Sequence, residues 1–203
     1  MPVSPPETRA SLILRLQDAA DVVAWDEFTD VYAPVVYRSA RRMGLQAADA
    51  DDCAQEVLSS VARSVSKWLQ RDNRGPFRAW LFRIARNTAI DFLTRRKHQP
   101  WAEGGDAAAA ELGKIEAPPD VSSHFNLEYH REMFLRASEI VRQQVNETNW
   151  QAFYRTSVLL ESVEEAGHQL GVSTGRVYLA RSRVMKRLQQ VVQTMEGSAH
   201  DKV

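Results

Sequence analysis

Apolar residues along the chain recur at steps of three and four, which is the spacing of one face of an α-helix. The pattern predicts a helix over about 22–43, kinked but not ended by Pro34, because the same apolar face resumes beyond the ring. It predicts two further helices over about 49–68 and 77–96, separated by a polar, turn-rich loop at 70–76. Strand-like alternation of useful length and internal repeats are both missing from the sequence. We therefore predict an all-α fold.

The composition changes after these helices. Residues 98–125 combine prolines, paired glycines, an alanine run and scattered acids without an apolar period, which predicts a flexible linker. Helical spacing resumes near Asn126 and continues as far as Leu159, so a second all-helical domain follows. The predicted organisation is a lead-in at 1–20, a helical domain at 21–97, a linker at 98–125, a second helical domain at 126–195 and a tail at 196–203. We expect two small helical domains joined by a flexible linker. For residues 11–16 of the lead-in, a short helix packed on the first domain is the alternative to a functional role.

The second domain contains the spacing of a helix-turn-helix motif. Gly167 lets two helices approach, Gly171 permits a left-handed turn between them, and Val177 can plug the second helix into the core. Ser173 can cap that second helix, whose apolar face is Val177, Val184, Leu188 and Val191. Its basic residues lie elsewhere on the helix, as in a recognition helix that enters the major groove of DNA. An ordinary helical hairpin with a basic solvent face is the alternative.

Charge is strongly segregated along the 203 residues, although the formal net charge is zero. Successive blocks carry net charges of −4 over 1–65, +7 over 66–97, −7 over 98–172 and +5 over 173–195. Two separate basic blocks indicate two contact surfaces for a polyanion such as a nucleic acid. Two solvated helix faces are the alternative explanation.

The first basic block interleaves cations with aromatic residues around the loop at 67–77. Aromatic rings beside cations suit the binding of unstacked single-stranded bases, and loops offer adaptable polar groups to such bases. For Trp80, Leu81 and Ile84, a stripe in the helical core is the stronger alternative.

Several other classes of protein find no support in the sequence. The apolar runs are shorter than a membrane span and the opening residues lack the order of a signal peptide, so we expect a cytoplasmic protein. The single Cys53 reads as a small buried hydrophobe. Ser64 and Lys67 have the spacing of a penicillin-binding nucleophile but lack its companion motifs, and Gly113-Lys114 lacks the glycine of a P-loop. The histidines show no metal-ligand spacing. We expect no enzyme activity, no cofactor and no metal site.

Two segments carry a family resemblance. Asp52-Cys-Ala-Gln55-Glu56-Val57-Leu58, the segment Phe77-Arg-Ala-Trp-Leu-Phe-Arg-Ile-Ala-Arg-Asn87-Thr-Ala-Ile-Asp91 and the run Arg95-Arg96-Lys97 resemble region 2 of the extracytoplasmic function (ECF) sigma factors. The helix-turn-helix ending Val177-Tyr-Leu-Ala-Arg181-Ser-Arg183 is similar to their region 4. The two matches cover roughly 21–97 and 126–195, in the order that the family has.

The resemblance implies a dissociable, non-catalytic subunit that joins core RNA polymerase, recognises a promoter and opens it. The implied partners are the core polymerase, through its beta-prime clamp helices and its beta flap, and promoter DNA, with an anti-sigma factor as a further candidate; neither a membrane nor a small-molecule substrate is implied. The implied core-binding residues are Asp52, Gln55 and Glu56. The implied minus-ten DNA-binding residues are Lys67, Arg71, Asn73, Arg74, Phe77, Arg78, Arg83 and Asn87. The implied minus-35 DNA-binding residues are Ser173, Thr174, Arg176, Tyr178, Arg181, Arg183 and Lys186.

The chain departs from the family pattern at two places that matter here. Gly167 stands where alanine is usual, and Val177-Tyr178-Leu179-Ala180 replaces the commoner pattern after that valine, so the bases read at the minus-35 site cannot be copied from better-known members. The competing function is a stand-alone helix-turn-helix regulator. Such a protein would need a dimer interface or a sensor pocket, and it would bind duplex DNA without the polymerase.

Overall fold

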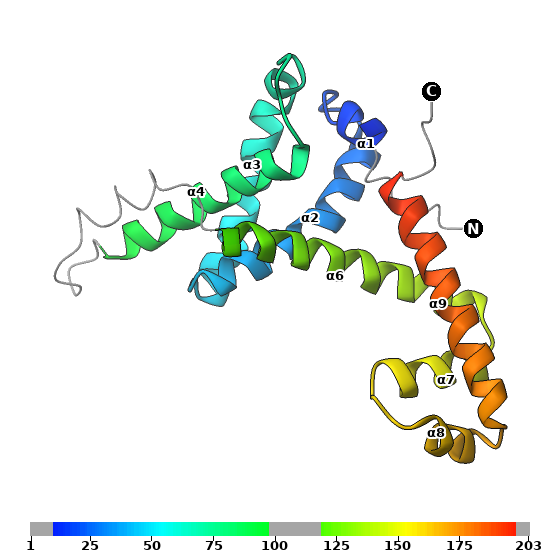
Figure 1. Ribbon diagram of the computed structural model, residues 1–203. Helices are drawn as coiled ribbons and strands as arrows, with labels where there is room; N and C mark the ends of the chain where they lie inside the picture. The colour runs from blue at the N-terminus through cyan, green and yellow to red at the C-terminus, as the bar shows by residue number, and fades with distance from the viewer. Residues whose placement is uncertain (1–9, 98–118, 198–203) are drawn as a thin grey trace. The chain divides into compact units, whose positions relative to one another are not determined.

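The fold is helical throughout the part of the chain that the structure describes. The computed structural model describes residues 10–97 and 119–197, which form eight helices and no strand (Figure 1). The prediction of an all-α fold is therefore confirmed. The predicted linker residues 98–118 lie outside the described residues. The chain divides into two compact units, which we call the N-terminal unit (10–132) and the C-terminal unit (133–197 among the described residues).

The N-terminal unit is built on three long helices. Its elements are α1 (Ala10–Arg15), α2 (Val22–Arg42), α3 (Ala47–Leu69), α4 (Phe77–Lys97) and the first half of α6 (Pro119–Gln144). The long helices bury the apolar stripes that the sequence predicts, including Phe28 on α2, Val57 on α3 and Leu81 on α4, each with 0% exposure. α3 begins at Ala47, two residues before the predicted start, and α2 continues through Pro34.

The lead-in packs on this unit as a short helix. Leu12 and Leu16 are buried, and Arg15 bonds both carboxylate oxygens of Asp21 at 2.7 and 2.8 Å. Asp21 also caps α2 by accepting from the amide of Ala24, so the hydrogen bond from Arg15 and the cap lower the pKa of its carboxyl. The structure therefore bears out the alternative of a short helix packed on this unit, and Arg15 links that helix to the residue that caps α2.

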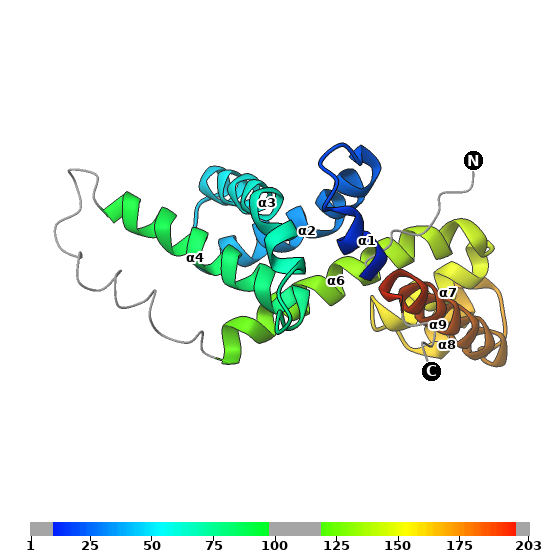
Figure 2. The same cartoon turned by 90° about the horizontal axis from the view of Figure 1, so that it is seen from above.

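The C-terminal unit contains the second half of α6, α7 (Glu147–Ser157), α8 (Val163–Leu170) and α9 (Thr174–Glu196), shown from a second direction in Figure 2. Two helix bounds differ from the predictions. α6 begins at Pro119, inside the stretch that we expected to be linker. α7 ends at Ser157, so Val158 and Leu159 lie in a loop with 46% and 51% exposure. The helix cannot continue there because Leu160 has a left-handed backbone, with φ 59°.

Candidate nucleic-acid interface

The turn between α8 and α9 has helix-turn-helix geometry. Gly171 ends α8 with a left-handed backbone at φ 65°, and Ser173 caps α9 by accepting from the amide of Arg176. A Cβ at Gly167 would lie 2.9 Å from the carbonyl oxygen of Val172, so the two helices meet with no space for a methyl group. Val177 is fully buried beneath the turn. The roles expected for Gly167, Gly171, Ser173 and Val177 are therefore confirmed.

One face of α9 is buried and the rest is exposed. Val177, Val184 and Leu188 are buried, while Val191 is half-buried. The predicted minus-35 residues are all exposed, namely Ser173, Thr174, Arg176, Tyr178, Arg181, Arg183 and Lys186. The nearby Arg187 donates from Nε to the Oε1 atom of Gln144 at 2.9 Å. All seven predicted minus-35 side chains are therefore open to solvent, and four of them are cationic.

The acidic residues of α3 lie on its solvent face. Asp52, Gln55 and Glu56 are exposed, while Cys53 and Val57 on the opposite face are buried. Arg63 folds back to donate to Glu56 at 2.8 Å, a contact that sequence reasoning missed. Because both side chains are more than half exposed, this ion pair stabilises the fold little and leaves Glu56 available to an incoming cation.

Cys53 contributes packing to the same helix. It is fully buried, and burial raises the pKa of its thiol to about 11. The thiol therefore stays protonated and weakly nucleophilic at neutral pH, as expected for a small core hydrophobe.

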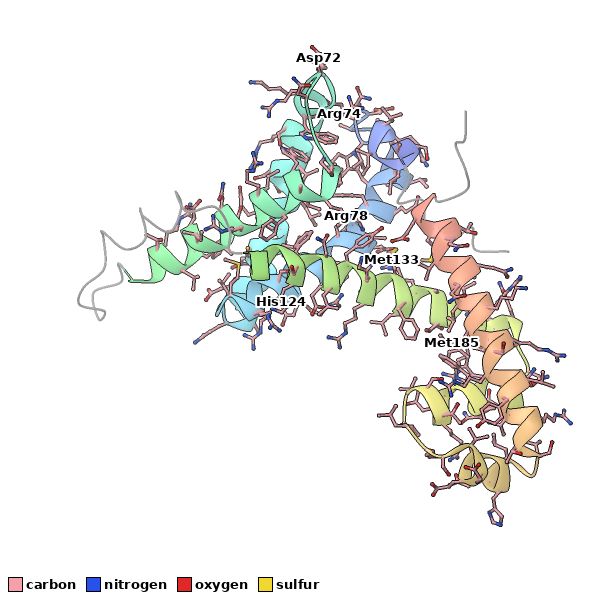
Figure 3. All side chains as sticks on the ribbon, viewed as in Figure 1. Asp72, Arg74, Arg78, His124, Met133 and Met185 are labelled. Carbon is pink, nitrogen blue, oxygen red and sulfur yellow. The ribbon has the colours of Figure 1, made fainter. Side chains whose placement is uncertain are left out.

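Hydrogen bonds within the loop between α3 and α4 hold its backbone in place. The indole Nε1 of Trp68 donates to the carbonyl of Arg74 at 3.1 Å, and Arg74 Nη1 donates to the carbonyl of Leu69 at 3.0 Å. Gly75 supplies a left-handed backbone, with φ 65°. Asp72 and Arg74 stand at the outer tip of this loop (Figure 3).

The aromatic residues next to this loop pack on one another. Trp68 stacks on Trp80 with ring centroids 5.2 Å apart, and Phe77 contacts Trp68, Trp80, Phe28 and Tyr32 at 5.4–5.9 Å. Trp68 is 5% exposed, whereas Phe77 and Trp80 are half-buried. These rings form the support of the loop, in line with the core alternative that the sequence left open for Trp80.

Most of the predicted minus-ten residues face solvent around this support. The exposed ones are Lys67, Arg71, Asn73, Arg74, Arg83 and Asn87. Arg83 and Asn87 share the outer face of α4, as their four-residue spacing predicts. Arg78 differs, because its guanidinium lies over the ring of Tyr129, with Cζ 4.3 Å from the ring centroid.

Tyr129 belongs to a cluster that sequence reasoning missed. It lies on the first half of α6, where Glu128 and Glu132 bond Arg38 of α2. The spacing of Phe125, Glu128, Tyr129 and Glu132 on one helix face was the available signal. Sequence reasoning placed residues from 126 onward in the second domain, so it did not predict that this helix face packs on the first domain.

The described residues offer little for metal or membrane chemistry. Over 10–97 and 119–197, no group of three or more histidine, cysteine, aspartate or glutamate side chains is placed to hold a metal ion. In the same ranges, no helix combines the length and apolar composition that a membrane span requires.

A helix-turn-helix in one helical unit and exposed cations beside an acidic helix face in another are features of a transcription protein. Comparison with known proteins finds similarity to RNA polymerase sigma factors. The family model described as "Sigma-70 region 2" matches residues 29–99. The chain is 26% identical over 178 residues to the ECF RNA polymerase sigma factor RpoE of Cereibacter sphaeroides, covering 88% of this chain and 93% of that protein. It is 38% identical over 79 residues to SigE of Mycolicibacterium smegmatis, covering 39% and 29%, and 23% identical over 180 residues to SigW of Bacillus subtilis, covering 84% and 92%.

Over most of its length, the chain is therefore similar to ECF RNA polymerase sigma factors, and residues 29–99 match sigma-70 region 2. A search of solved structures also finds CnrH, in complex with the cytosolic domain of CnrY, at 20% identity and a TM-score of 0.36, covering 91% of this chain and 96% of that one.

Proposed function

We propose that this sigma factor binds core RNA polymerase through the acidic face of α3 and reads promoter DNA with two separate surfaces. The observation that carries the proposal is that both predicted DNA surfaces are exposed on different compact units, while the acidic residues form a third exposed surface on another helix. Sigma factors of this family direct the polymerase to specific promoters, and separate surfaces suit the reading of two separate promoter elements.

For the acidic face, the proposed partner is the clamp helices of the beta-prime subunit. Asp52, Gln55 and Glu56 offer two carboxylates and an amide to basic and polar partner groups. The contact must compete with Arg63, which already bonds Glu56, but that exposed pair costs little to break. The beta flap is the second proposed contact on the polymerase, made by the C-terminal unit.

For the minus-ten element, the proposed ligand is the single strand of the opened promoter. The loop at 70–76, held by its own hydrogen bonds, presents Arg71, Asn73 and Arg74 on a rigid aromatic support, with Arg83 and Asn87 beside it on α4. Capture of an unstacked base together with phosphate contacts favours the open duplex, because unstacking costs only a few kcal/mol. The chain needs no catalytic group, cofactor or metal for this step, and we propose that it acts in the cytoplasm, without enzyme activity.

For the minus-35 element, the proposed reader is α9 in the major groove. Arg176, Tyr178, Arg181 and Arg183 project from the exposed face beyond the buried stripe, as the recognition helix of a helix-turn-helix does. Arginine pairs well with guanine edges and with phosphates, so these side chains supply both base reading and anchoring.

The test is run-off transcription from genomic fragments with purified core polymerase and the full chain. Glu56→Lys is expected to abolish core binding and transcripts, and the matched control is Asp26→Lys, a reversal at an exposed position of α2. Arg181→Ala with Arg183→Ala is expected to lose promoter-dependent transcripts but keep core binding, and Arg142→Ala on α6 is its control. Duplex DNA binding without core polymerase, together with no core binding, would replace this proposal with a stand-alone helix-turn-helix regulator.

A further inference from the structure

The first half of α6 packs as a fifth helix on the N-terminal unit. α6 belongs to this compact unit as far as Glu132. Phe125 and Tyr129 are 1% and 3% exposed, because Phe125 meets Phe82 of α4 at 5.5 Å and Tyr129 stacks on Tyr32 of α2 at 5.8 Å. The start of α6 lies beside α2 and α4 in both ribbon views (Figures 1 and 2). Residues 123–132, which we call the α6 latch, therefore use one apolar face to bind two helices.

Charge complementarity holds the same face in register. Arg38 of α2 donates from Nε to Glu128 at 2.5 Å and from Nη2 to Glu132 at 2.9 Å. The side chains of Arg38, Glu128 and Glu132 are only 23%, 16% and 9% exposed, so these bonds are shielded from water and are stronger than surface pairs. One cation on α2 thus binds two acids one helical turn apart on the α6 latch.

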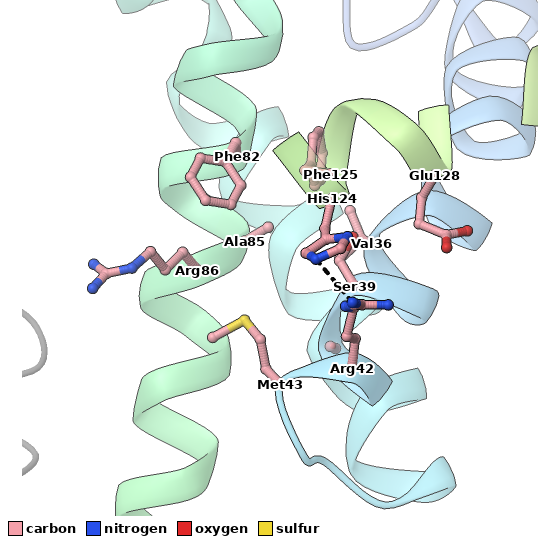
Figure 4. Close-up of a pocket in the computed structure, with 11 residues that line it drawn as sticks. Val36, Ser39, Arg42, Met43, Phe82, Ala85, Arg86, His124, Phe125 and Glu128 are labelled. Atoms are coloured by element: carbon pink, nitrogen blue, oxygen red, sulfur yellow. Dashed lines mark hydrogen bonds between the residues drawn. The ribbon is translucent and has the colours of Figure 1, made fainter. Parts of the chain in front are cut away.

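The packing under the latch is less complete than in the core. A cavity of about 200 Å³ remains between α2, α4 and the start of α6. Figure 4 shows Met43, Phe82 and Phe125 around it, with His124 bonded to Arg42 at 2.8 Å at its rim. Unfilled space removes contact energy that a close-packed interface would have, so it weakens the packing of the latch on α2 and α4.

The latch covers part of the surface proposed to bind DNA. The Arg78 guanidinium lies 4.3 Å from the centre of the Tyr129 ring, and Phe77 lies against Tyr32, which Tyr129 covers in turn. The Tyr129 ring covers one face of the Arg78 guanidinium and Arg78 is half-buried, so a DNA strand reaches this side chain less easily while the latch is closed. The remaining predicted minus-ten residues stay exposed.

We propose that the α6 latch is an intramolecular partner of region 2, which holds Arg78 on Tyr129 and shields it from a DNA phosphate. The acidic and aromatic face of the latch occupies the groove between α2 and α4 in the free chain. Closure of the latch competes with the binding of nucleic acid at Arg78, so the closed population lowers the apparent affinity of region 2 for single-stranded DNA. This inference rests on the proposed function only for the identity of the DNA that Arg78 meets.

The first experiment measures closure in the full chain without polymerase or DNA. Hydrogen exchange of the amides in 123–132 is compared between the wild type and the double variant Glu128→Gln and Glu132→Gln. The control double variant, Glu139→Gln and Glu164→Gln, removes the same charge at exposed positions. Loss of the charge-assisted bonds is expected to speed exchange in 123–132 by roughly tenfold or more. Equal exchange in the wild type, the latch variant and the control would overturn the latch.

The second experiment measures coupling between the latch and Arg78. Binding of the full chain to a fluorescent oligothymidylate is measured over a range of salt concentrations. In the double variant Glu128→Gln and Glu132→Gln, which we call the latch variant, Arg78 is expected to add one phosphate contact. The slope of log affinity against log salt concentration should then steepen by about 0.7. Arg78→Ala is expected to remove that gain in the latch variant and to change little in the wild type. An equal effect of Arg78→Ala in both backgrounds would overturn the proposal, whether or not the chain binds core polymerase.

Discussion

The close approach at Gly167 allows a sharp test of the helix-turn-helix. In the interior of an exposed helix, Gly→Ala raises stability by roughly 0.5–1 kcal/mol, because alanine has less backbone freedom to lose. At Gly167 the new Cβ would lie 2.9 Å from the backbone oxygen of Val172. That atom cannot rotate away like a side-chain end, so the methyl group must push the turn itself.

The size of the effect follows from the two opposing contributions. Overpacking of this kind costs about 1–3 kcal/mol, which exceeds the gain in helix propensity. The displaced turn also contains the hydrogen bond from the amide of Val172 to the carbonyl of Gly167, which is 3.0 Å long. We expect Gly167→Ala to lower the free energy of unfolding of the C-terminal unit by about 1–2 kcal/mol, a factor of roughly 5–30 in its unfolding equilibrium.

The assay is hydrogen exchange of amides in α8 and α9 of the full chain, because it reports on this unit separately. Gly175→Ala is the matched control, since a Cβ at Gly175 would have nothing within 4 Å and it lies in the first turn of α9. We expect Gly175→Ala to leave protection unchanged or to raise it. If Gly167→Ala raised protection as much as Gly175→Ala, the argument from the close approach would be refuted.

Three further predictions concern single positions. Gly171→Ala should lower the hydrogen-exchange protection of α8 and α9 by about 1–2 kcal/mol, because alanine is strained at φ 65°. Gly171→Asn should lower this protection less, because asparagine adopts the left-handed conformation more readily, and equal losses for the two variants would contradict the argument. Leu160→Gly should raise the free energy of unfolding in urea by up to about 1 kcal/mol, because Leu160 has φ 59° and is 81% exposed, and a decrease would show that its side chain contributes packing. Cys53 should resist thiol reagents in the folded chain. Burial raises the pKa of the Cys53 thiol from 9.0 to about 11, so the folded chain holds this proton more tightly than the unfolded chain. The resulting contribution to the free energy of unfolding is complete below pH 9 and is lost as the pH rises through 11, by roughly 2–3 kcal/mol. Cys53→Ala should remove that part of the alkaline loss in urea unfolding; an unchanged loss would contradict the shift.

Sequence reasoning predicted the features that depend on local spacing. The three long helices of the N-terminal unit, the cap at Ser173 and the left-handed turn at Gly171 follow from apolar periodicity and from residue types with strong local preferences. The exposure of the α9 residues followed as well, because Val177 fixes which side of that helix faces the core.

Contacts between distant segments could not be predicted in the same way. The composition of 98–125 is typical of a linker, so the sequence did not predict that α6 starts at Pro119. The few apolar residues at the start of this helix are buried only because α2 and α4 pack against them, and the sequence does not show that contact. The bonds from Arg38 to Glu128 and Glu132 join residues about ninety positions apart, and the fold of Arg63 onto Glu56 depends on side-chain conformation. Periodicity gives the faces of helices but not which faces meet.

The internal fastening of the α3–α4 loop affects the thermodynamics of promoter capture. Trp68 and Arg74 already fix the loop backbone in the free chain through bonds of 3.1 and 3.0 Å. A disordered loop would lose conformational entropy when it bound a strand, whereas this loop has lost most of it on folding. Strand capture by this loop should therefore show a small heat-capacity change and a small entropic penalty, the calorimetric signature of a rigid template rather than of coupled folding and binding.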